Sequence, residues 1–457
     1  MGTETGMAKH VLIVGGGYVG MYTALRLHKK MRRELKRGEL KITVVDPQSY
    51  MTYQPFLPEA AAGNLEPRHV VVPLRRVLPR ATILNGRVTR IEHANRQAWV
   101  EIVGGASAEG VGGGQADRSP ETRILSYDIL VFCPGSISRT LPIPGLAECG
   151  IGFKTVGEAI YLRNHVLAQL DIAASTANPQ TRKRALTFVF VGGGFAGVEA
   201  LAELEDLARD ACEYYTNIEP SDMRWVLVEA SDHILPEVGA DMGRWTVDAL
   251  RQRGIAVKLE TLLKSAEGHH IVLSDGEEFD AGTLVWTAGV KPNPVAKRTD
   301  LPVDEKSRVK ATAELTVEGV SDAFTAGDTA AVPDLTKPGE FTAPNAQHAV
   351  RQAKTLGDNV VASLRGRQLQ PYKHAYAGSV ASLGLHKGVA QIYGIKMRGL
   401  LAWFMHRTYH LSRVPTFNRK ARVTADWTLA FFFKREVVSL GAIQRPREEF
   451  ELAARKD

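Results

Sequence analysis

Three glycines near the start of the chain have the spacing of a turn that could bind a pyrophosphate. Gly15, Gly17 and Gly20 follow the apolar run VLIV and lead into a helical pattern. The first glycine of such a turn allows a tight bend, the second lets a phosphate approach the backbone, and the third lets the helix pack on the strand. Free N–H groups and the dipole at the helix N-terminus then favour negative charge. Asp46 ends the next apolar run, where a carboxylate can bind both hydroxyl groups of a ribose.

The same arrangement occurs again in the middle of the chain. Gly192, Gly194 and Gly197 follow the apolar run FVFV, and Glu229 ends the partner strand. Strand, glycine turn, helix and strand make a βαβ unit, so two copies predict two dinucleotide-binding domains. A carboxylate at Glu229 would bind the adenosine ribose and repel a 2′-phosphate, and no Lys or Arg follows within residues 230–233. The second site is therefore predicted to prefer NADH to NADPH.

Two other acidic residues could contribute to these sites. Asp328 lies in the turn TAGDT after an apolar strand, and this turn could bring it near the ribityl and pyrophosphate groups of an FAD in the first site. The alternative is a plain turn in which Asp328 caps a helix. Glu199 lies in the helix just after Gly197. It is either an acid stabilised by the helix dipole or a carboxylate near the point where nicotinamide meets flavin.

The elements around these motifs indicate an α/β fold with two Rossmann-type domains. Each apolar run before a glycine turn lacks alternation, as expected for a strand buried on both faces of a parallel sheet. Two further predicted strands, Tyr127–Cys133 and Leu284–Thr287, precede turns at Gly135 and Gly289. Residues 104–120 are rich in glycine and are expected to form a hairpin tip. The predicted domains are 1–150 with 303–389 for the FAD, 151–302 for NADH, and a C-terminal module at 390–457.

The composition limits the compartment and the partners. A chain of 457 residues is too long for one hydrophobic core. Its three cysteines form no CxxC pair, which argues against a disulfide scaffold and a metal site and favours a reducing compartment. Neither a signal peptide nor an apolar run long enough to span a bilayer is predicted. The net charge of +7 predicts an anionic partner.

The last part of the chain combines basic and aromatic residues. Asp426 and Glu436 are the only acids between residues 391 and 440, which also contain the apolar runs Leu400–Met405 and Trp427–Phe433. Both runs are too short to cross a bilayer, so the module is predicted to lie in the interface of an anionic membrane. A homodimer interface or a solvated basic face is the alternative, and no nucleic-acid-binding fold is recognised. The basic residues of this module are Lys396, Arg398, Arg407, Arg413, Arg419, Lys420, Arg422, Lys434 and Arg435.

Several segments, taken in order, give the chain a wider resemblance. They are Tyr53–Pro58 (YQPFLP), Val156–Val166 (VGEAIYLRNHV), Val228–Pro236 (VEASDHILP), Val285–Pro294 (VWTAGVKPNP) and the TAGD turn. The chain resembles the pyridine nucleotide–disulfide oxidoreductase superfamily without its disulfide and, within it, the type II NADH dehydrogenases. The resemblance implies that Tyr53–Pro58 lines the flavin ring. The cofactor-binding residues predicted beyond the two glycine turns and their acids are Gln54, Pro55, Gly135, Gly289, Gly327, Asp328 and Ala346.

The resemblance also implies a quinone acceptor. Ala346, Gln347 and Ala349 match the family pattern AQxAxQ, but Arg351 stands where the second Gln is expected. Gln352 is one position further along and would point about 100° away on a helix. The quinone is then expected near Gln347, and Glu199 gains a role near the flavin–quinone region. The alternative is a core-facing helix that happens to contain Gln.

These features predict an FAD-dependent oxidoreductase that passes electrons from NADH through FAD to a membrane quinone, without proton pumping. The enzyme would attach to the cytoplasmic face of the membrane as a monotopic protein. Two alternatives stay open. A sulfide:quinone reductase would need two cysteines beside the flavin, and Cys133 and Cys149 lack an evident partner. A redox sensor that holds FAD and NAD⁺ without turnover would accommodate Arg351 in place of Gln.

Overall fold

The computed structural model describes residues 8–103, 121–374 and 378–440, and the predicted hairpin tip at 104–120 lies outside them. The first α/β unit contains a seven-stranded sheet in the order β20-β8-β1-β2-β5-β6-β7. Its first five strands in this order are parallel, and β6 and β7 add an antiparallel extension. The bounds are β1 Lys9–Val14, β2 Leu40–Asp46, β5 Thr82–Glu92, β6 Gln97–Ile102, β7 Thr122–Ser126, β8 Ile129–Phe132 and β20 Ala323–Thr325.

Two helices from opposite ends of the chain cover one face of this sheet. α1 (Tyr18–Lys30) and α10 (Ala346–Leu364) pack together, and Arg26 of α1 forms an ion pair with Asp358 of α10. Their apolar faces share one core cluster with β1. The glycine turn that precedes α1 is thus fixed between a strand whose last four residues are buried and a packed helix pair.

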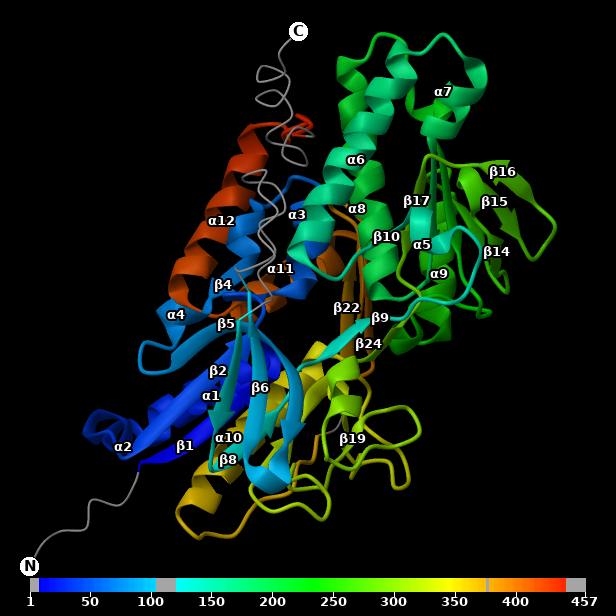
Figure 1. The fold of residues 1–457 in the computed structure, drawn as a ribbon. Coiled ribbons are helices and arrows are strands. Elements are labelled where there is room, and N and C mark those ends of the chain that lie inside the picture. The colour runs from blue at the N-terminus through cyan, green and yellow to red at the C-terminus, as the bar shows by residue number, and fades with distance from the viewer. Residues whose placement is uncertain (1–7, 104–120, 375–377, 441–457) are drawn as a thin grey trace, which may run out of the picture.

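The second α/β unit contains a five-stranded parallel sheet in the order β10-β17-β11-β12-β13. Figure 1 shows it beside the first unit, with α6 and α8 on the side that faces the C-terminal helices. The chain leaves the first sheet after β8, builds the second, and returns with β20. The bounds are β10 Gly150–Gly152, β11 Thr187–Val191, β12 Arg224–Val228, β13 Ala256–Lys258, β17 Thr283–Trp286, α6 Val156–Ser175, α7 Pro179–Ala185, α8 Phe195–Ala211 and α9 Ala240–Arg251.

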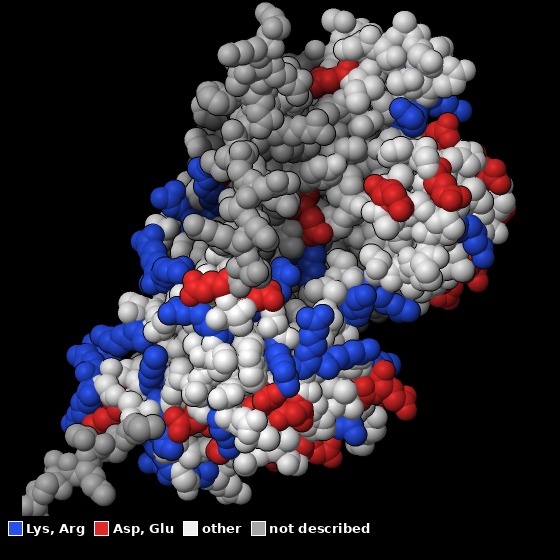
Figure 2. Space-filling view, viewed as in Figure 1, with Lys and Arg blue, Asp and Glu red and all other residues white. Residues whose placement is uncertain are grey.

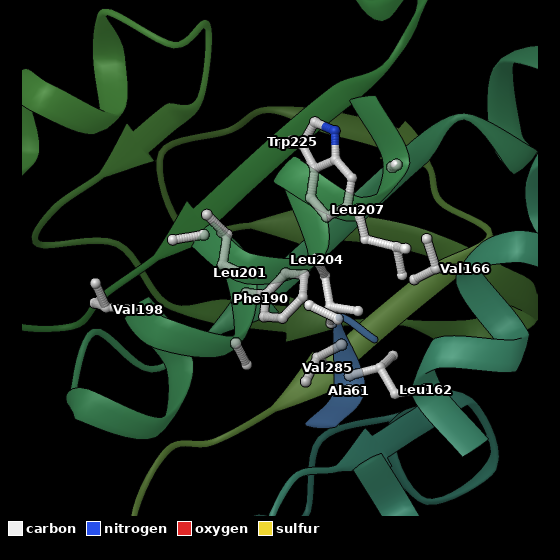
Figure 3. Close-up of a cluster of buried hydrophobic side chains, with 14 of the residues drawn as sticks. Ala61, Leu162, Val166, Phe190, Val198, Leu201, Leu204, Leu207, Trp225 and Val285 are labelled. Carbon is white, nitrogen blue, oxygen red and sulfur yellow. The ribbon is translucent and has the colours of Figure 1, made fainter. Parts of the chain in front are cut away.

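One hydrophobic core joins the two units. Figure 3 shows Phe190 and Trp225 of the second sheet packed with Leu204 of α8 and Leu162 of α6, and Ala61 of α3 (Leu57–Ala61) reaches the same cluster from the first unit. Burial of such apolar surface is the main stabilising contribution to folding. The two glycine turns therefore lie on units whose relative position is set by packed side chains.

The C-terminal region adds a small sheet and two helices. The antiparallel sheet β22-β23-β24 starts at Gly378, ahead of the predicted boundary at residue 390, and α11 and α12 follow it. Within the described ranges, every helix is too short or too polar to cross a membrane. The bounds are β22 Gly378–Ser382, β23 Gly388–Ile392, β24 Ile395–Arg398, α11 Gly399–Arg413 and α12 Phe417–Phe432.

Short elements complete the described chain. The predicted α/β class with two mainly parallel sheets is confirmed. β9 and β18 form a ribbon between the two units, and β14-β15-β16 form a separate sheet. The bounds are α2 Arg32–Arg37, β3 Tyr50–Thr52, β4 Val71–Pro73, α4 Leu74–Val77, β9 Ser136–Ser138, α5 Leu146–Cys149, β14 Leu263–Ser265, β15 His270–Leu273, β16 Glu278–Asp280, β18 Val290–Pro292, β19 Val309–Lys310 and β21 Ala330–Ala331.

Candidate functional site

The first glycine turn has the geometry that a bound pyrophosphate requires. Gly15 has a positive φ of 99°, and a Cβ on it would lie 2.3 Å from the carbonyl oxygen of Cys133. A Cβ on Gly20 would lie 1.8 Å from the Gly15 carbonyl oxygen, so the helix can approach the strand only without a side chain. At Gly17, no described atom lies within 4 Å of that position. The turn is therefore tight on its inner side and open where a phosphate would bind.

The start of α1 leaves its backbone donors available. No side chain caps this helix at Gly17, and its first turn contains no acid. Unpaired N–H groups at a helix start, with the helix dipole, make an anion site. Asp46 holds the turn from the other side: it accepts hydrogen bonds from Gly16 N (2.6 Å) and Gln48 N (2.7 Å). Burial raises the pKa of the Asp46 carboxyl, and these two backbone hydrogen bonds oppose the rise.

The second glycine turn repeats this geometry. Gly192 has a φ of 115°, and a Cβ on it would lie 2.8 Å from the backbone of Thr287. A Cβ on Gly197 would lie 2.0 Å from the Gly192 carbonyl oxygen, whereas the space around Gly194 is open to 4 Å among the described atoms. Glu229 accepts hydrogen bonds from Gly193 N (2.5 Å) and from Ser231 N (2.8 Å). Both turns thus use a carboxylate in which each oxygen accepts one backbone N–H and keeps further acceptor capacity for ribose hydroxyl groups.

The TAGD turn lies against the first glycine turn. A Cβ on Gly327 would meet Val19 of α1 at 2.8 Å. Asp328 accepts a hydrogen bond from Ser136 (2.6 Å), which in turn accepts one from Lys154 Nζ (2.8 Å). Burial lowers the pKa of Lys154, and the nearby Asp328 opposes this. Lys154 therefore brings a cation to the first site, and the sequence motifs did not identify it.

The predicted residues Gly135, Gly289 and Gln54 lie along the connection between the two units. Gly135 and Gly289 flank the paired strands β9 and β18, in which Ser136 is aligned with Pro292. Gln54 donates a hydrogen bond to the carbonyl oxygen of Lys154 (3.3 Å). Pro55 follows it in a 3-10 helix that leads into α3. This connection therefore brings the turns at Gly135 and Gly289, which follow a strand of each sheet, next to each other.

The two glutamines of the helix with the AQxAxQ-like pattern have different hydrogen-bond partners. Gln347 donates to the carbonyl oxygen of Gly378 (3.1 Å), and its side-chain oxygen lies 3.1 Å from His374 Nε2. Gln352 is buried and links Gly327 N to the hydroxyl group of Thr342. Gln352 thus holds the TAGD turn. Ala346 is the first residue of α10.

Glu199 and Gln347 contact the two ends of strand β22. Glu199 Oε1 accepts a hydrogen bond from Ser382 N (2.8 Å), whereas Gln347 contacts Gly378. The same Glu199 oxygen lies 3.2 Å from His406 Nε2, and both side chains are buried. The structure therefore places a buried histidine from α11 beside Glu199. No sequence motif indicated His406.

A second buried pair lies next to the first. Arg407 donates to Glu59 Oε2 (2.8 Å), and Trp427 Nε1 donates to the same oxygen (2.7 Å). The Arg407 guanidinium also lies over the rings of Trp403 and Trp427, at 4.1 and 4.8 Å from their centroids. The assignment of Arg407 to a basic membrane surface was therefore wrong, because its charge is neutralised inside the protein.

Arg435 also departs from the predicted basic surface. Its side chain is 5% exposed and pairs with Asp210 of α8 (2.7 Å). One further acid on α8, Glu203, is fully buried and accepts hydrogen bonds from Asn64 (3.0 Å) and Ser382 (2.8 Å). Burial, followed by the nearby Glu59, raises the pKa of Glu203 to about 7. The C-terminal module is thus attached to both units through buried polar contacts.

Comparison with known proteins identifies the family of this chain and several similar proteins. The family described as pyridine nucleotide-disulphide oxidoreductase matches residues 9–353. The chain is 26% identical over 440 residues to the type II NADH:quinone oxidoreductase Ndh of Mycobacterium tuberculosis, covering 93% of this chain and 88% of that protein. It is 27% identical over 461 residues to the internal alternative NAD(P)H-ubiquinone oxidoreductase A1 of Arabidopsis thaliana, covering 95% and 86%. The structure of NDH2 from Plasmodium falciparum in complex with NADH superposes with a TM-score of 0.84 at 16% identity, over 94% and 99% of the chains.

Proposed function

This chain belongs to the pyridine nucleotide-disulphide oxidoreductase family, and we propose that it is a type II NADH:quinone oxidoreductase, which transfers electrons from NADH to a quinone. The family predicted from the sequence is confirmed. The observation that carries the proposal is the repeated turn: two open glycine cradles, each closed by one carboxylate, lie on two packed units of one chain. Relatives with this activity match nearly the whole chain.

The first turn fits an FAD. Gly17 and the uncapped start of α1 would hold the pyrophosphate, and Asp46 the ribose. Asp328, with Ser136 and Lys154 behind it, would contact the ribityl and pyrophosphate region. A bound FAD supplies the chemistry that accepts two electrons from NADH and passes them to the acceptor. The protein supplies position, shielding from water and charge.

The second turn would hold NADH. Gly194 and the uncapped start of α8 leave room and donors for its pyrophosphate. Glu229 would accept the ribose hydroxyl groups and repel a 2′-phosphate, which supports NADH as the preferred donor. The ribbon of β9 and β18 between the units would hold the two nucleotides at a constant distance.

The acceptor side would use the pair Glu199–His406. Quinone reduction consumes protons, and a buried carboxyl and imidazole with Glu199 Oε1 and His406 Nε2 3.2 Å apart are side chains that can take part in proton transfer. Gln347 would orient the quinone through its amide, as the match to AQxAxQ suggests. Gln347 and Glu199 are held on the same strand, because Gln347 bonds to Gly378 at one end of β22 and Glu199 to Ser382 at the other.

The C-terminal helices would attach the enzyme to the membrane. Leu400, Leu401 and Phe404 of α11 are each 60% exposed, and Phe431 and Phe432 of α12 are 71% and 77% exposed. Figure 2 shows Lys and Arg side chains along the left edge of the molecule, over α12 and α4. Apolar side chains beside cations favour the interface of an anionic bilayer. We place this face on the cytoplasmic side; a homodimer through the same face is the alternative.

Anaerobic titration of the purified protein tests the proposal. The protein is expected to show flavin absorbance that NADH bleaches and a water-soluble quinone analogue restores. Glu229→Gln is the matched control: it should keep the flavin and bleach only at higher NADH concentrations. A colourless protein that does not take up added FAD would overturn the proposal. Sulfide in place of NADH should not bleach the flavin, because Cys133 and Cys212 are buried and all three cysteines are unpaired.

A further inference from the structure

An open groove of about 390 Å³ lies between the first unit and the start of α12. One wall is apolar and consists of Leu25 of α1 with Val72, Pro73 and Val77 of the β4–α4 segment. The other side carries Arg76, Arg419, Thr416 and Asn418, and no acidic residue lines the groove. The groove thus offers cations on one side and hydrocarbon contacts on the other.

The two arginines of this groove have no counter-ion among the described residues. Neither Arg76 nor Arg419 forms an ion pair within the described part of the chain. Partial burial, with Arg422 and Arg76 close by, lowers the pKa of Arg419. Like charges placed together without acids repel each other, and a bound phosphate relieves the repulsion through charge-assisted hydrogen bonds. The groove therefore has the electrostatics of an anion site.

The start of α12 adds to this preference. The helix has 16 residues and no acid in its first turn, and Thr416 of the groove caps it by accepting a hydrogen bond from Arg419 N (3.4 Å). The dipole of a helix favours an anion at this end. Phe417 is 85% exposed, so an apolar side chain projects next to the groove. An exposed apolar side chain thus lies beside the anion site, at the end of α12 opposite Phe431 and Phe432.

We propose that this groove binds one anionic phospholipid of the membrane, with the lipid phosphate between Arg76 and Arg419. The glycerol and the first part of an acyl chain would lie along Leu25, Val72 and Val77. The volume suits a headgroup with the start of its chains, since small-ligand sites occupy roughly 300–1,000 Å³. A lipid fits better than a soluble anion because only a lipid uses the cations, the apolar wall and the exposed Phe417 together. This inference rests on the proposed membrane attachment.

Vesicle binding by the full chain tests the proposal. The variant R76Q/R419Q is compared with K297Q/R298Q, which removes the same charge from the exposed 3-10 helix packed beside β5. Each arginine near an anionic bilayer contributes about 1 kcal/mol to binding, and roughly 1.4 kcal/mol is a tenfold change in affinity. On vesicles of phosphatidylcholine mixed with phosphatidylglycerol, R76Q/R419Q should therefore bind about thirtyfold more weakly than the wild type. K297Q/R298Q should bind like the wild type. Equal binding by both variants would overturn the proposal.

A short-chain lipid separates a site from general surface charge. Dihexanoyl-phosphatidylglycerol below its micelle concentration should bind the wild type and K297Q/R298Q, and not R76Q/R419Q, in isothermal titration calorimetry. Inorganic phosphate should bind more weakly, because it leaves the apolar wall unfilled; equal affinity would show a free-phosphate site and overturn the lipid assignment. NADH oxidation with a water-soluble quinone should be unchanged in both variants. If the wild type does not oxidise NADH with this quinone, the proposed function is refuted, and the lipid-binding result is unaffected.

Discussion

The buried ion pair between Arg407 and Glu59 makes a sharp prediction about stability. Arg407 and Glu59 side chains are 8% and 1% exposed, and their atoms lie 2.8 Å apart. In Arg407→Met, the carboxylate would stay buried with Trp427 Nε1 as its one remaining hydrogen-bond donor in the described structure. A buried charge without its partner is the state that proteins tolerate least.

The magnitude follows from the burial. Breaking one partner of a buried ion pair costs about 3–5 kcal/mol. For domains of this size, each kcal/mol shifts the unfolding temperature by about 2–4 °C, so Arg407→Met should lower it by roughly 6–20 °C. The double variant with Glu59→Met removes both charges and should recover about half of this loss, because the desolvation penalty disappears with the carboxylate. What remains is the unpaired Trp427 N–H, at about 1–3 kcal/mol.

Differential scanning calorimetry of the flavin-loaded protein measures these shifts. Arg413→Met is the matched control, since Arg413 is exposed at the end of the same helix and should change stability by no more than about 0.5 kcal/mol. The cycle also yields the coupling between the two residues. If Arg407→Met melts with the wild type, or if the double variant is the least stable of the set, the pair does not hold the module as described.

Three further outcomes test the sites. Burial raises the pKa of Glu203 to about 7, above the ordinary 4.5. Ionisation of this carboxyl therefore lowers the stability of the folded state as the pH rises from about 4.5 to about 7. Glu203→Gln should unfold at a higher urea concentration than the wild type at about pH 8, and the two proteins should unfold alike below about pH 4.5. Asp46→Asn should lower the flavin content after purification, whereas Glu229→Gln should raise the KM for NADH with the flavin content and kcat unchanged. The opposite result, with flavin lost in Glu229→Gln and the KM raised in Asp46→Asn, would show that FAD binds the second turn and NADH the first. Gly20→Ala should fail to fold or bind flavin, because its Cβ would lie 1.8 Å from a carbonyl oxygen, while Gly17→Ala should fold and lose only flavin affinity, as circular dichroism and absorbance would show.

The sequence was sufficient for the two glycine turns because everything that defines them is local. The strand, the turn, the helix and the closing acid lie within one βαβ unit, and glycine is required by backbone sterics that no distant residue can alter. Asp46 and Glu229 therefore lie where the pattern predicts, each bonded to its own turn. The TAGD turn also meets α1, although its position depends on a strand that returns to the sheet late in the chain.

The polar contacts around α11 could not be predicted from the sequence because each needs a partner from another unit. His406 and Arg407 are adjacent, and their acids come from α8 and α3. In the sequence, Arg407 is one cation among many, and only the packing of α3 and α12 buries it. The same applies to Arg351: the pattern shows a missing Gln, but the structure shows that Arg351 bonds to the carbonyl oxygen of Gln347, one helical turn earlier.

The two turns are alike in geometry but differ in what surrounds them, and this difference gives a physical reason for two kinds of nucleotide binding. The first turn is covered by the TAGD turn, which Gln352 holds in place and which brings Asp328 to the site. The second turn is closed by Glu229 and by the strand that ends at Trp286. A nucleotide in the first site would contact segments distant in the chain, so its release would require several of them to move. A nucleotide in the second site would contact mainly one βαβ unit, as suits a substrate that must leave after each reaction.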